Sequence, residues 1–589
     1  MMAQRLPSVD VLLVGFGWTG AIMAQELTEA GHDVLALERG SWRDTGTDFA
    51  PSFIQDELRY RYHGHLFEQT AQETLTFRNT PDQTALPMRR LGSFLPGTGV
   101  GGSILHWNGQ AFRFLPYDFE IRRQTAARYG EAMIPADMTL QDWGVTYDEL
   151  EPHYMRWEEL CGIAGQAGNV KGQKLPGGNP FEGQRSKPYP TPPMKQTYGP
   201  ALFGEAAGSL KLHPFPCPSG NMSQAYTNPL GVSMAPCTYC GFCEKFGCGN
   251  YSKASVQTTI LPVLMQNKNF TLRTECEVTR INLDASGTHA TGVTYVDAHG
   301  NEFEQPAELV IVCAYILHNV HLLMTSGIGT KYDPATGQGT LGKNYCYQLT
   351  PSVDVFFEDK VLNPFVGAGA LGMIVDDWNG DNFDHTGLGF IHGGYIAAYM
   401  TTGRPIETEL LPEGTPKWGA KWKQAFVKNY LTSMSISLMG AVMPNKVNYL
   451  DLDPTYRDVY GRPLMRMTYD FKQNELKLQD FALGKMADIA KAMHPREIKK
   501  SPRGPHYDIV PYQSTHNTGG AVMGVSRRES VVNRYLQHWD VSNLFVVGAS
   551  AFPHNSGYNP TGTVSALALW AAEAIRSQYL KHPGPLVQS

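Results

Sequence analysis

The first forty residues carry the pattern that most limits the fold. An apolar run at 9–14 (VDVLLV) is followed by GFGWTG, by a helical stretch and by a second apolar run that ends at Glu38. Short apolar runs of this kind are typical of buried parallel strands. Gly15, Gly17 and Gly20 allow a pyrophosphate to approach the helix N-terminus, and a carboxylate about 20 residues on suits the ribose hydroxyls. The pattern predicts a dinucleotide-binding unit but does not choose FAD over NAD, and a turn that only packs a helix on a sheet is the alternative.

The bulk composition is that of a globular protein. The chain has 589 residues, of which 18% are charged, and a formal net charge of −6. This length predicts two or more domains, and the charge gives no indication of a nucleic-acid surface. No apolar run approaches the roughly 18 residues of a membrane span. The N-terminus leads directly into the first apolar run, so we expect no signal peptide.

Four cysteines lie within twelve residues, in the segment PCTYCGFCEKFGC. They are Cys237, Cys240, Cys243 and Cys248, with the spacing C-x2-C-x2-C-x4-C. C-x2-C-x2-C is a spacing found in iron–sulfur proteins. Zinc is the first alternative, although zinc sites usually place a longer loop between two short pairs; disulfides or free thiols are the other. We interpret the segment as an iron–sulfur site, which indicates single-electron transfer.

The other five cysteines are scattered and are expected to be buried thiols rather than a disulfide framework. They are Cys161, Cys217, Cys276, Cys313 and Cys346.

The rest of the chain predicts a discontinuous α/β domain and a second, antiparallel domain. A second glycine loop, GTGVGG at 97–102, is suited to a close backbone approach to a flat ligand. Residues 137–165 predict a helix with Thr146 as its N-cap, whereas 165–235 lack periodicity and predict little regular structure. Alternating segments in 350–510 predict an antiparallel sheet. The C-terminus returns to a buried strand and a long helix, so the first domain is completed by the end of the chain.

Five ordered motifs resemble the glucose–methanol–choline (GMC) oxidoreductases, flavoenzymes that oxidise alcohols and sugars. They are GFGWTG with Glu38, GTGVGG, LLMTSGIG, STHNTGG, and NLFVVGASAFP followed by NPTGT. The resemblance implies an FAD-binding domain over 1–349 with the iron–sulfur segment at about 215–255, a substrate domain over 350–510, and a return to the FAD domain over 511–589. The cysteine segment lies outside the general GMC pattern and most resembles the flavoprotein subunits of membrane-bound gluconate 2-dehydrogenases.

The resemblance also implies the site residues. His516, in STHNTGG, matches the histidine that takes the alcohol proton, and Asn559, in NPTGT, matches its partner. An imidazole can serve as that base and an amide can only orient the hydroxyl. His554 and Asn555 lie close enough in sequence to be mistaken for this pair. His106, in GGSILHW, matches the position where some members attach FAD covalently.

The glycines of both loops, with Ala549 and Thr561 of the C-terminal motifs, complete the implied FAD site. The glycines are Gly15, Gly17, Gly20, Gly99, Gly101 and Gly102. In the second domain, His385, His392 and Arg404 are polar candidates that we expect to be structural, and the sequence identifies no basic residue that binds a substrate carboxylate.

The function implied is an FAD-dependent dehydrogenase subunit that oxidises a sugar or sugar acid, with D-gluconate to 2-keto-D-gluconate first. A [3Fe–4S] cluster, or alternatively [4Fe–4S], would pass electrons to a multihaem cytochrome c subunit. A small subunit with an export signal would carry the folded chain to the periplasmic face, with membrane contact only through partners. The alternatives are another sugar, polyol or keto-sugar acid as substrate, a GMC oxidase that uses oxygen, and an electron carrier without substrate chemistry.

Overall fold

The protein is described by a computed structural model that covers residues 3–49, 66–67, 74–88, 92–401 and 410–588. Its first sheet has the strand order β11-β3-β2-β14-β13-β12, with β1 and β22 also paired to β14. The strands of this sheet are β1 Gln4–Arg5, β2 Val9–Val14, β3 Val34–Leu37, β11 Phe270–Arg273, β12 Glu277–Leu283, β13 Ala290–Val296, β14 Glu302–Val312 and β22 Leu544–Val546.

The parallel half of this sheet is the predicted nucleotide-binding unit. The strands β3, β2, β14 and β22 pair in parallel, and residues 11–14, 34–37, 309–312 and 544–546 of these strands are buried. A parallel sheet covered on both faces requires such apolar strands. The helix α1 (Trp18–Glu29) connects β2 to β3, and the Trp18 indole N–H donates to Ser565 Oγ of α12 (Thr561–Ala574) at 2.6 Å. The C-terminal helix therefore closes the domain that the N-terminus begins, as the sequence predicts.

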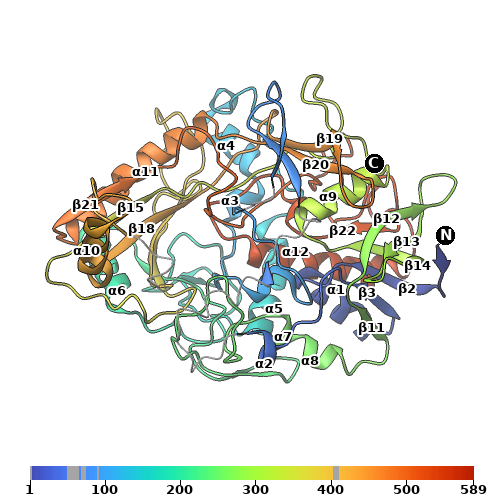
Figure 1. The fold of residues 1–589 in the computed structure, drawn as a ribbon, viewed down its shortest axis with the longest axis horizontal. Helices are drawn as coiled ribbons and strands as arrows, with labels where there is room; N and C mark the ends of the chain where they lie inside the picture. Colours follow the sequence, from blue (N-terminus) through green and yellow to red (C-terminus); the bar gives the residue numbers. More distant parts are fainter. Residues whose placement is uncertain (1–2, 50–65, 68–73, 89–91, 402–409, 589) are drawn as a thin grey trace.

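The second sheet is antiparallel, also as predicted, and has the order β21-β15-β18-β17-β16-β8. Its strands are β8 Phe215–Pro216, β15 Ser352–Phe356, β16 Gly372–Val375, β17 Gly394–Tyr399, β18 Ser433–Gly440 and β21 Glu497–Ser501. The helices α6 (Tyr198–Ser209), α10 (Ala420–Asn429) and α11 (Gln473–Ala492) lie around it, at the end of the molecule opposite the first sheet (Figure 1).

Other elements connect the two sheets. A smaller sheet has the order β19-β20-β4-β5, in which strands from the C-terminal half of the chain pair with strands from its N-terminal part. These strands are β4 Leu75–Arg78, β5 Leu86–Met88, β19 Tyr449–Arg457 and β20 Pro463–Thr468. The remaining α-helices are α2 Thr45–Asp48, α3 Pro116–Phe119, α4 Ile121–Tyr129, α5 Tyr147–Cys161, α7 Val256–Thr259, α8 Leu261–Leu264 and α9 Ile316–Thr325. Short hairpins β6 Asn169–Val170 with β7 Gln173–Lys174, and β9 Tyr226–Thr227 with β10 Ser233–Met234, complete the strands.

The local predictions for residues 137–235 are partly confirmed. The helix α5 begins after Thr146, whose side chain and Glu149 form a capping box. The prediction of little regular structure over 165–235 is wrong for α6, a helix of 12 residues. The sequence does not indicate α6, because it contains Pro200, Gly204 and Gly208, and proline and glycine are poor helix formers. Packing against α11 and β16 stabilises the helix. None of the helices in the described part of the chain is both long and apolar enough to span a membrane.

Candidate active site

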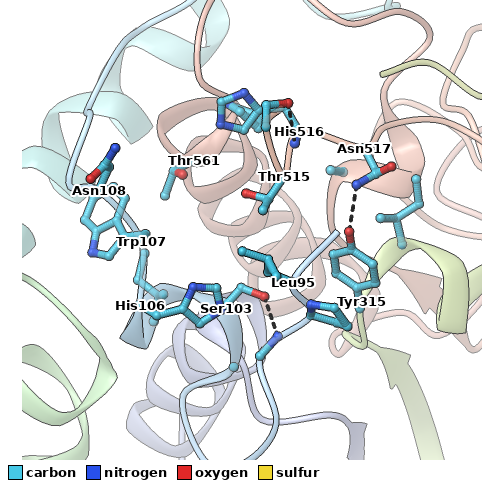
Figure 2. Close-up of a pocket in the computed structure, with 18 of the residues that line it drawn as sticks. Leu95, Ser103, His106, Trp107, Asn108, Tyr315, Thr515, His516, Asn517 and Thr561 are labelled. Carbon is cyan, nitrogen blue, oxygen red and sulfur yellow. Dashed lines mark hydrogen bonds between the residues drawn. The ribbon is translucent and has the colours of Figure 1, made fainter. Parts of the chain in front are cut away.

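One cavity of about 840 Å³ connects the glycine turns to the C-terminal motifs. Both glycine loops, the second sheet and the segments around His516 and Asn559 line it. In Figure 2, His106, Trp107 and Asn108 follow one wall, His516 reaches the pocket from another side, and Thr561 lies between them at the start of α12. The volume is in the range of cavities that hold organic cofactors and substrates.

The first glycine turn has no room for a side chain at Gly15 or Gly20. Gly15 has φ +93°, in the region that favours glycine. A Cβ on Gly20 would lie 2.4 Å from the Gly15 carbonyl oxygen. The Glu38 carboxylate accepts hydrogen bonds from the N–H groups of Phe16 and Gly40, both at 2.8 Å, and burial raises its pKa. The turn thus places backbone N–H groups of α1 and one carboxylate at the same end of the cavity.

The second glycine loop lies directly against the first. A Cβ on Gly102 would approach Gly17 Cα to 3.0 Å, so the two backbones are in contact. Seven of the implied cofactor residues line the cavity: Gly15, Gly17, Glu38, Gly102, His106, Ala549 and Thr561. The other three, Gly20, Gly99 and Gly101, shape the turns behind it. A narrow cleft between two glycine turns, with a helix N-terminus at one end, fits a dinucleotide.

His516 and Asn559 meet in the cavity, and their hydrogen bonds fix one tautomer of the histidine. Asn559 Nδ2 lies 3.1 Å from His516 Nε2, so the amide donates and Nε2 accepts. On the other side of the ring, His516 Nδ1 bonds to Gln348 Oε1. Gln348 Nε2 donates to the Ser556 carbonyl at 3.4 Å, which leaves Oε1 to accept from the imidazole. Burial lowers the pKa of His516 to about 3, so the ring is neutral. Its Nε2 lone pair can act as a base once a substrate hydroxyl replaces the Asn559 N–H there.

The orientation of the Asn559 amide is also fixed. Tyr395 donates its hydroxyl proton to Asn559 Oδ1 at 2.8 Å, and Asn559 Nδ2 donates to Gln110 Oε1. The amide nitrogen therefore faces His516. Gln110, Gln348 and Tyr395 could not be predicted from the sequence, since none belongs to a motif and each reaches the site only through the tertiary fold.

His554 and Asn555 do not replace this pair. His554 is fully buried, and neither residue lines the cavity. Asn555 Nδ2 donates to the carbonyls of Tyr347 and His516, at 2.6 and 2.7 Å. Asn555 therefore holds the backbone of the base, without presenting a group to the cavity.

His554 belongs to a group of possible metal ligands behind the site. Asp118, His392 and His554 have ligand atoms within 4.8 Å of one another and are buried. Both histidines accept at Nδ1, from the Gly393 N–H at 2.8 Å and from the Trp143 indole N–H at 3.2 Å. Each Nε2 therefore carries a proton and donates to Asp118. Since neither imidazole keeps a lone pair for a cation, the group is a structural hydrogen-bond network.

The two other polar candidates of the second domain have different outcomes. His385 is buried and bonds to the Gly380 carbonyl at 2.9 Å, which fits the structural role predicted for it. Arg404 lies outside the described residues.

The four cysteines lie in an irregular segment that borders the cavity wall. Cys243 is buried, and Cys237, Cys240 and Cys248 are half-buried. No three of their sulfur atoms, all in the described part of the chain, lie within 4.8 Å of one another. A tetrahedral zinc ion with Zn–S bonds of about 2.3 Å would hold sulfurs roughly 3.8 Å apart. The sulfur atoms of the four cysteines are therefore more widely spaced than a tetrahedral zinc site requires.

A buried lysine connects this segment to the cavity wall. The Lys253 ammonium donates to the carbonyls of Trp107, Cys243 and Phe246, at 2.7, 2.9 and 2.7 Å. Its side chain is 1% exposed, and it forms no ion pair with a carboxylate among the described residues. Burial raises the pKa of the Cys243 thiol, and the nearby Lys253 charge opposes that rise. An unbalanced buried cation beside four thiols fits a site for an anionic thiolate-bound centre.

Comparison with known proteins identifies the family. Two models described as GMC oxidoreductase match residues 221–350 and 444–568. The chain is 48% identical to the gluconate 2-dehydrogenase flavoprotein of Pantoea cypripedii, over 100% of this chain and 97% of that protein. It is 24% identical to the fructose dehydrogenase large subunit of Gluconobacter japonicus, over 98% and 99%.

A solved structure supports the same fold. Pyridoxine 4-oxidase from Mesorbium loti superposes with a TM-score of 0.58 at 16% identity, over 98% of this chain and 100% of that one. The full-length match at 48% identity, the two matching models and the fold agree, and the chain belongs to the GMC oxidoreductase family of FAD-binding enzymes that act on alcohol groups.

Proposed function

We propose that the chain is the flavoprotein subunit of a dehydrogenase that oxidises D-gluconate to 2-keto-D-gluconate and passes the electrons through an iron–sulfur cluster to a cytochrome c subunit. The match to a gluconate 2-dehydrogenase flavoprotein supports the substrate. FAD, when bound, supplies the hydride acceptor. Other sugars, polyols or keto-sugar acids are the alternative substrates.

The proton step falls to His516. A bound C2 hydroxyl takes the place of the Asn559 N–H at Nε2, which accepts the hydroxyl proton as the C2 hydride leaves. The Asn559 N–H released from Nε2 then donates to the same oxygen. Gln348 stabilises the imidazolium because the Nδ1–H bond becomes charge-assisted once the ring is protonated. Two polar groups thus meet the hydroxyl, and a third orients the base.

The proposed electron transfer is supported by the contact between the cavity wall and the cysteine segment. The Lys245 N–H donates to the His106 carbonyl at 2.9 Å, and the Lys253 ammonium bridges the Trp107 and Cys243 carbonyls. His106 and Trp107 line the cavity, and two hydrogen-bonded links join them to the cysteine segment. A cluster held by Cys237, Cys240, Cys243 and Cys248 would lie one layer of backbone from the cavity and would accept electrons singly. A [3Fe–4S] centre is our first choice and [4Fe–4S] the second.

His106 is the proposed attachment point for FAD. It is 5% exposed, lines the cavity beside Trp107, and packs edge-to-face on Phe67 with ring centroids 5.0 Å apart. A covalent bond at this wall would hold the cofactor against the segment that contacts the cysteines.

The partners and location follow from the same proposal. A small subunit with an export signal would bring the folded chain to the periplasmic face of the cytoplasmic membrane, and a multihaem cytochrome c subunit would accept the electrons there. Half-buried cysteines in an irregular segment leave part of that segment at the surface, where a cytochrome could dock.

A substrate panel on the purified complex tests the function. Gluconate, other sugar acids, aldoses and polyols are added under nitrogen with the native cytochrome or a dye as acceptor, and then in air without one. We expect reduction with gluconate under nitrogen and little turnover in air alone. Turnover in air alone would identify an oxidase, and no turnover with any compound would leave only an electron carrier.

A further inference from the structure

We propose that Arg503 binds the carboxylate of the substrate and so selects a 2-hydroxy acid over a neutral sugar. This inference rests on the proposed function, because it takes His516 as the base. Arg503 lies outside every motif of the sequence, but the fold brings it to the cavity that contains His516 and Asn559.

Thr350 holds the guanidinium of Arg503 in place and leaves three of its N–H protons without a partner among the described residues. Its Nε donates to the Thr350 carbonyl at 2.8 Å, and one Nη2 proton donates to Thr350 Oγ1 at 2.9 Å. Arginine has five N–H protons, so both Nη1 protons and the second Nη2 proton remain. These protons form the two-nitrogen end that binds a carboxylate bidentately.

The backbone of Arg503 is fixed as well. Gln479 of α11 accepts from the Arg503 N–H at 2.7 Å and donates to its carbonyl at 3.2 Å. Gln479 is itself buried. A long side chain that is clamped at both its backbone and its guanidinium loses little further entropy on binding an anion.

Arg503 differs from another cation of the same cavity. Arg462 is neutralised by Glu277 at 3.1 Å and Asp458 at 2.7 Å. Arg503 forms no ion pair among the described residues, and burial lowers its pKa while the nearby Tyr347 opposes that shift. A half-buried cation without a counter-ion is costly unless an anion arrives.

Arg503 also lies on the correct side of the base. Gln348 and Thr350 flank Leu349, which pairs with Gly440 through hydrogen bonds in both directions, at 3.2 and 2.8 Å. Residues two apart in an extended segment share a face. Gln348 contacts the imidazole of the base, and Thr350 holds Arg503. In a 2-hydroxy acid the carboxylate is bonded directly to the reacting carbon, so its cation must lie near the base.

Hydroxyl groups extend the same surface away from the base. Ser352 and Ser437 are register partners on β15 and β18, and both line the cavity with Thr350. Such hydroxyls can donate to and accept from a polyol chain. The cavity therefore offers a cation for C1 and neutral hydrogen-bonding groups for the remaining carbons.

The test compares a carboxylate with its neutral amide. Holoenzymes with Arg503→Gln, Arg503→Lys and Lys500→Gln are mixed anaerobically with D-gluconate or D-gluconamide, and flavin bleaching is followed against substrate concentration. Lys500 is exposed on the same segment and gives a control with the same change in charge. FAD content and thermal stability are measured first.

We expect Arg503→Gln to lower the apparent second-order rate constant for gluconate by roughly 10- to 150-fold, the worth of hydrogen bonds to a charged group. The value for gluconamide should change less than threefold, Arg503→Lys should lie between, and Lys500→Gln should match the parent. Equal losses for both compounds, or no loss for gluconate, would overturn the role of Arg503 while gluconate oxidation by the parent stands. A parent enzyme bleached by neutral sugars but not by gluconate would overturn the proposed function as well.

Discussion

Replacing Gln348 by methionine should slow proton abstraction while FAD stays bound. Methionine has nearly the same length but offers no acceptor comparable to Oε1. His516 Nδ1–H would lose its partner, and only the Asn559 N–H would still favour the tautomer with an unprotonated Nε2. Since Gln348 lies outside the cavity lining, cofactor contacts should be unchanged.

The size of the effect follows from the change in the hydrogen bond during the reaction. Before proton transfer the bond joins neutral groups, worth about 1 kcal/mol net, and afterwards it is charge-assisted, worth about 1.5–3 kcal/mol. The difference of about 0.5–2 kcal/mol is stabilisation present only after the imidazole takes the proton. It corresponds to a flavin-reduction rate roughly 2- to 30-fold lower.

Anaerobic stopped-flow absorbance at saturating gluconate measures that rate directly. Gln537→Met is the control, since Gln537 is buried but bonds to Ser542 and Gly584, and none of these three residues lines the cavity. Gln348→Glu gives a second signature, because a carboxylate beside the imidazole raises the pKa of His516. In that variant the rate should fall as the pH drops below the raised pKa. A Gln348→Met rate equal to that of the parent, or an equal loss in Gln537→Met, would refute the reasoning.

Three further outcomes are expected. His516→Ala should lower flavin reduction by roughly 10² to 10⁴ with FAD retained; near-normal stopped-flow rates would remove His516 as the base. Acid precipitation should leave yellow colour with the parent protein and release it from His106→Ala, and colour lost from the parent would show that FAD is not covalent. Burial lowers the pKa of His153 and His538 to about 4, against about 6.5 when unfolded. Between these pKa values the unfolded chain binds more protons than the folded chain. As the pH drops from 6.5 to 4, the free energy of unfolding should therefore fall by up to about 1.4 kcal/mol per pH unit for each histidine. The urea midpoints of the two His→Gln variants should fall less over the same pH range.

Much of the first domain could be predicted because its signals are local. The glycine turn, α1 and Glu38 lie within 30 residues, and each has one physical purpose in a βαβ unit. The helix α11 could also be predicted from its sequence, because the apolar residues Leu478, Ala482 and Met486 recur at helical spacing, and all three are buried. In contrast, β8 joins the second sheet from a distant part of the chain, and nothing in two residues predicts that pairing.

The motifs predict the two groups that meet the hydroxyl but not those that orient them. His516 and Asn559 are 43 residues apart and lie in recognisable segments. Gln348 is 168 residues from His516 and reaches it only because Cys346 pairs with Thr518, which joins two distant parts of the chain. Arg503 likewise depends on α11 and Thr350. Such residues carry no local signal, since glutamine or arginine in an irregular segment is ordinarily a solvated side chain.

The central claim is that the cysteine segment carries electrons from the substrate site to the cytochrome. Cys240→Ser in the complete complex tests it, with Cys161→Ser, a buried thiol at the end of α5, as control. FAD, iron and subunit content are measured first. Our account predicts a normal single-turnover bleaching of the flavin by gluconate, with steady-state cytochrome reduction almost abolished in Cys240→Ser alone. A well-folded Cys240→Ser complex that lacks the iron and still reduces the cytochrome at the parent rate would contradict it.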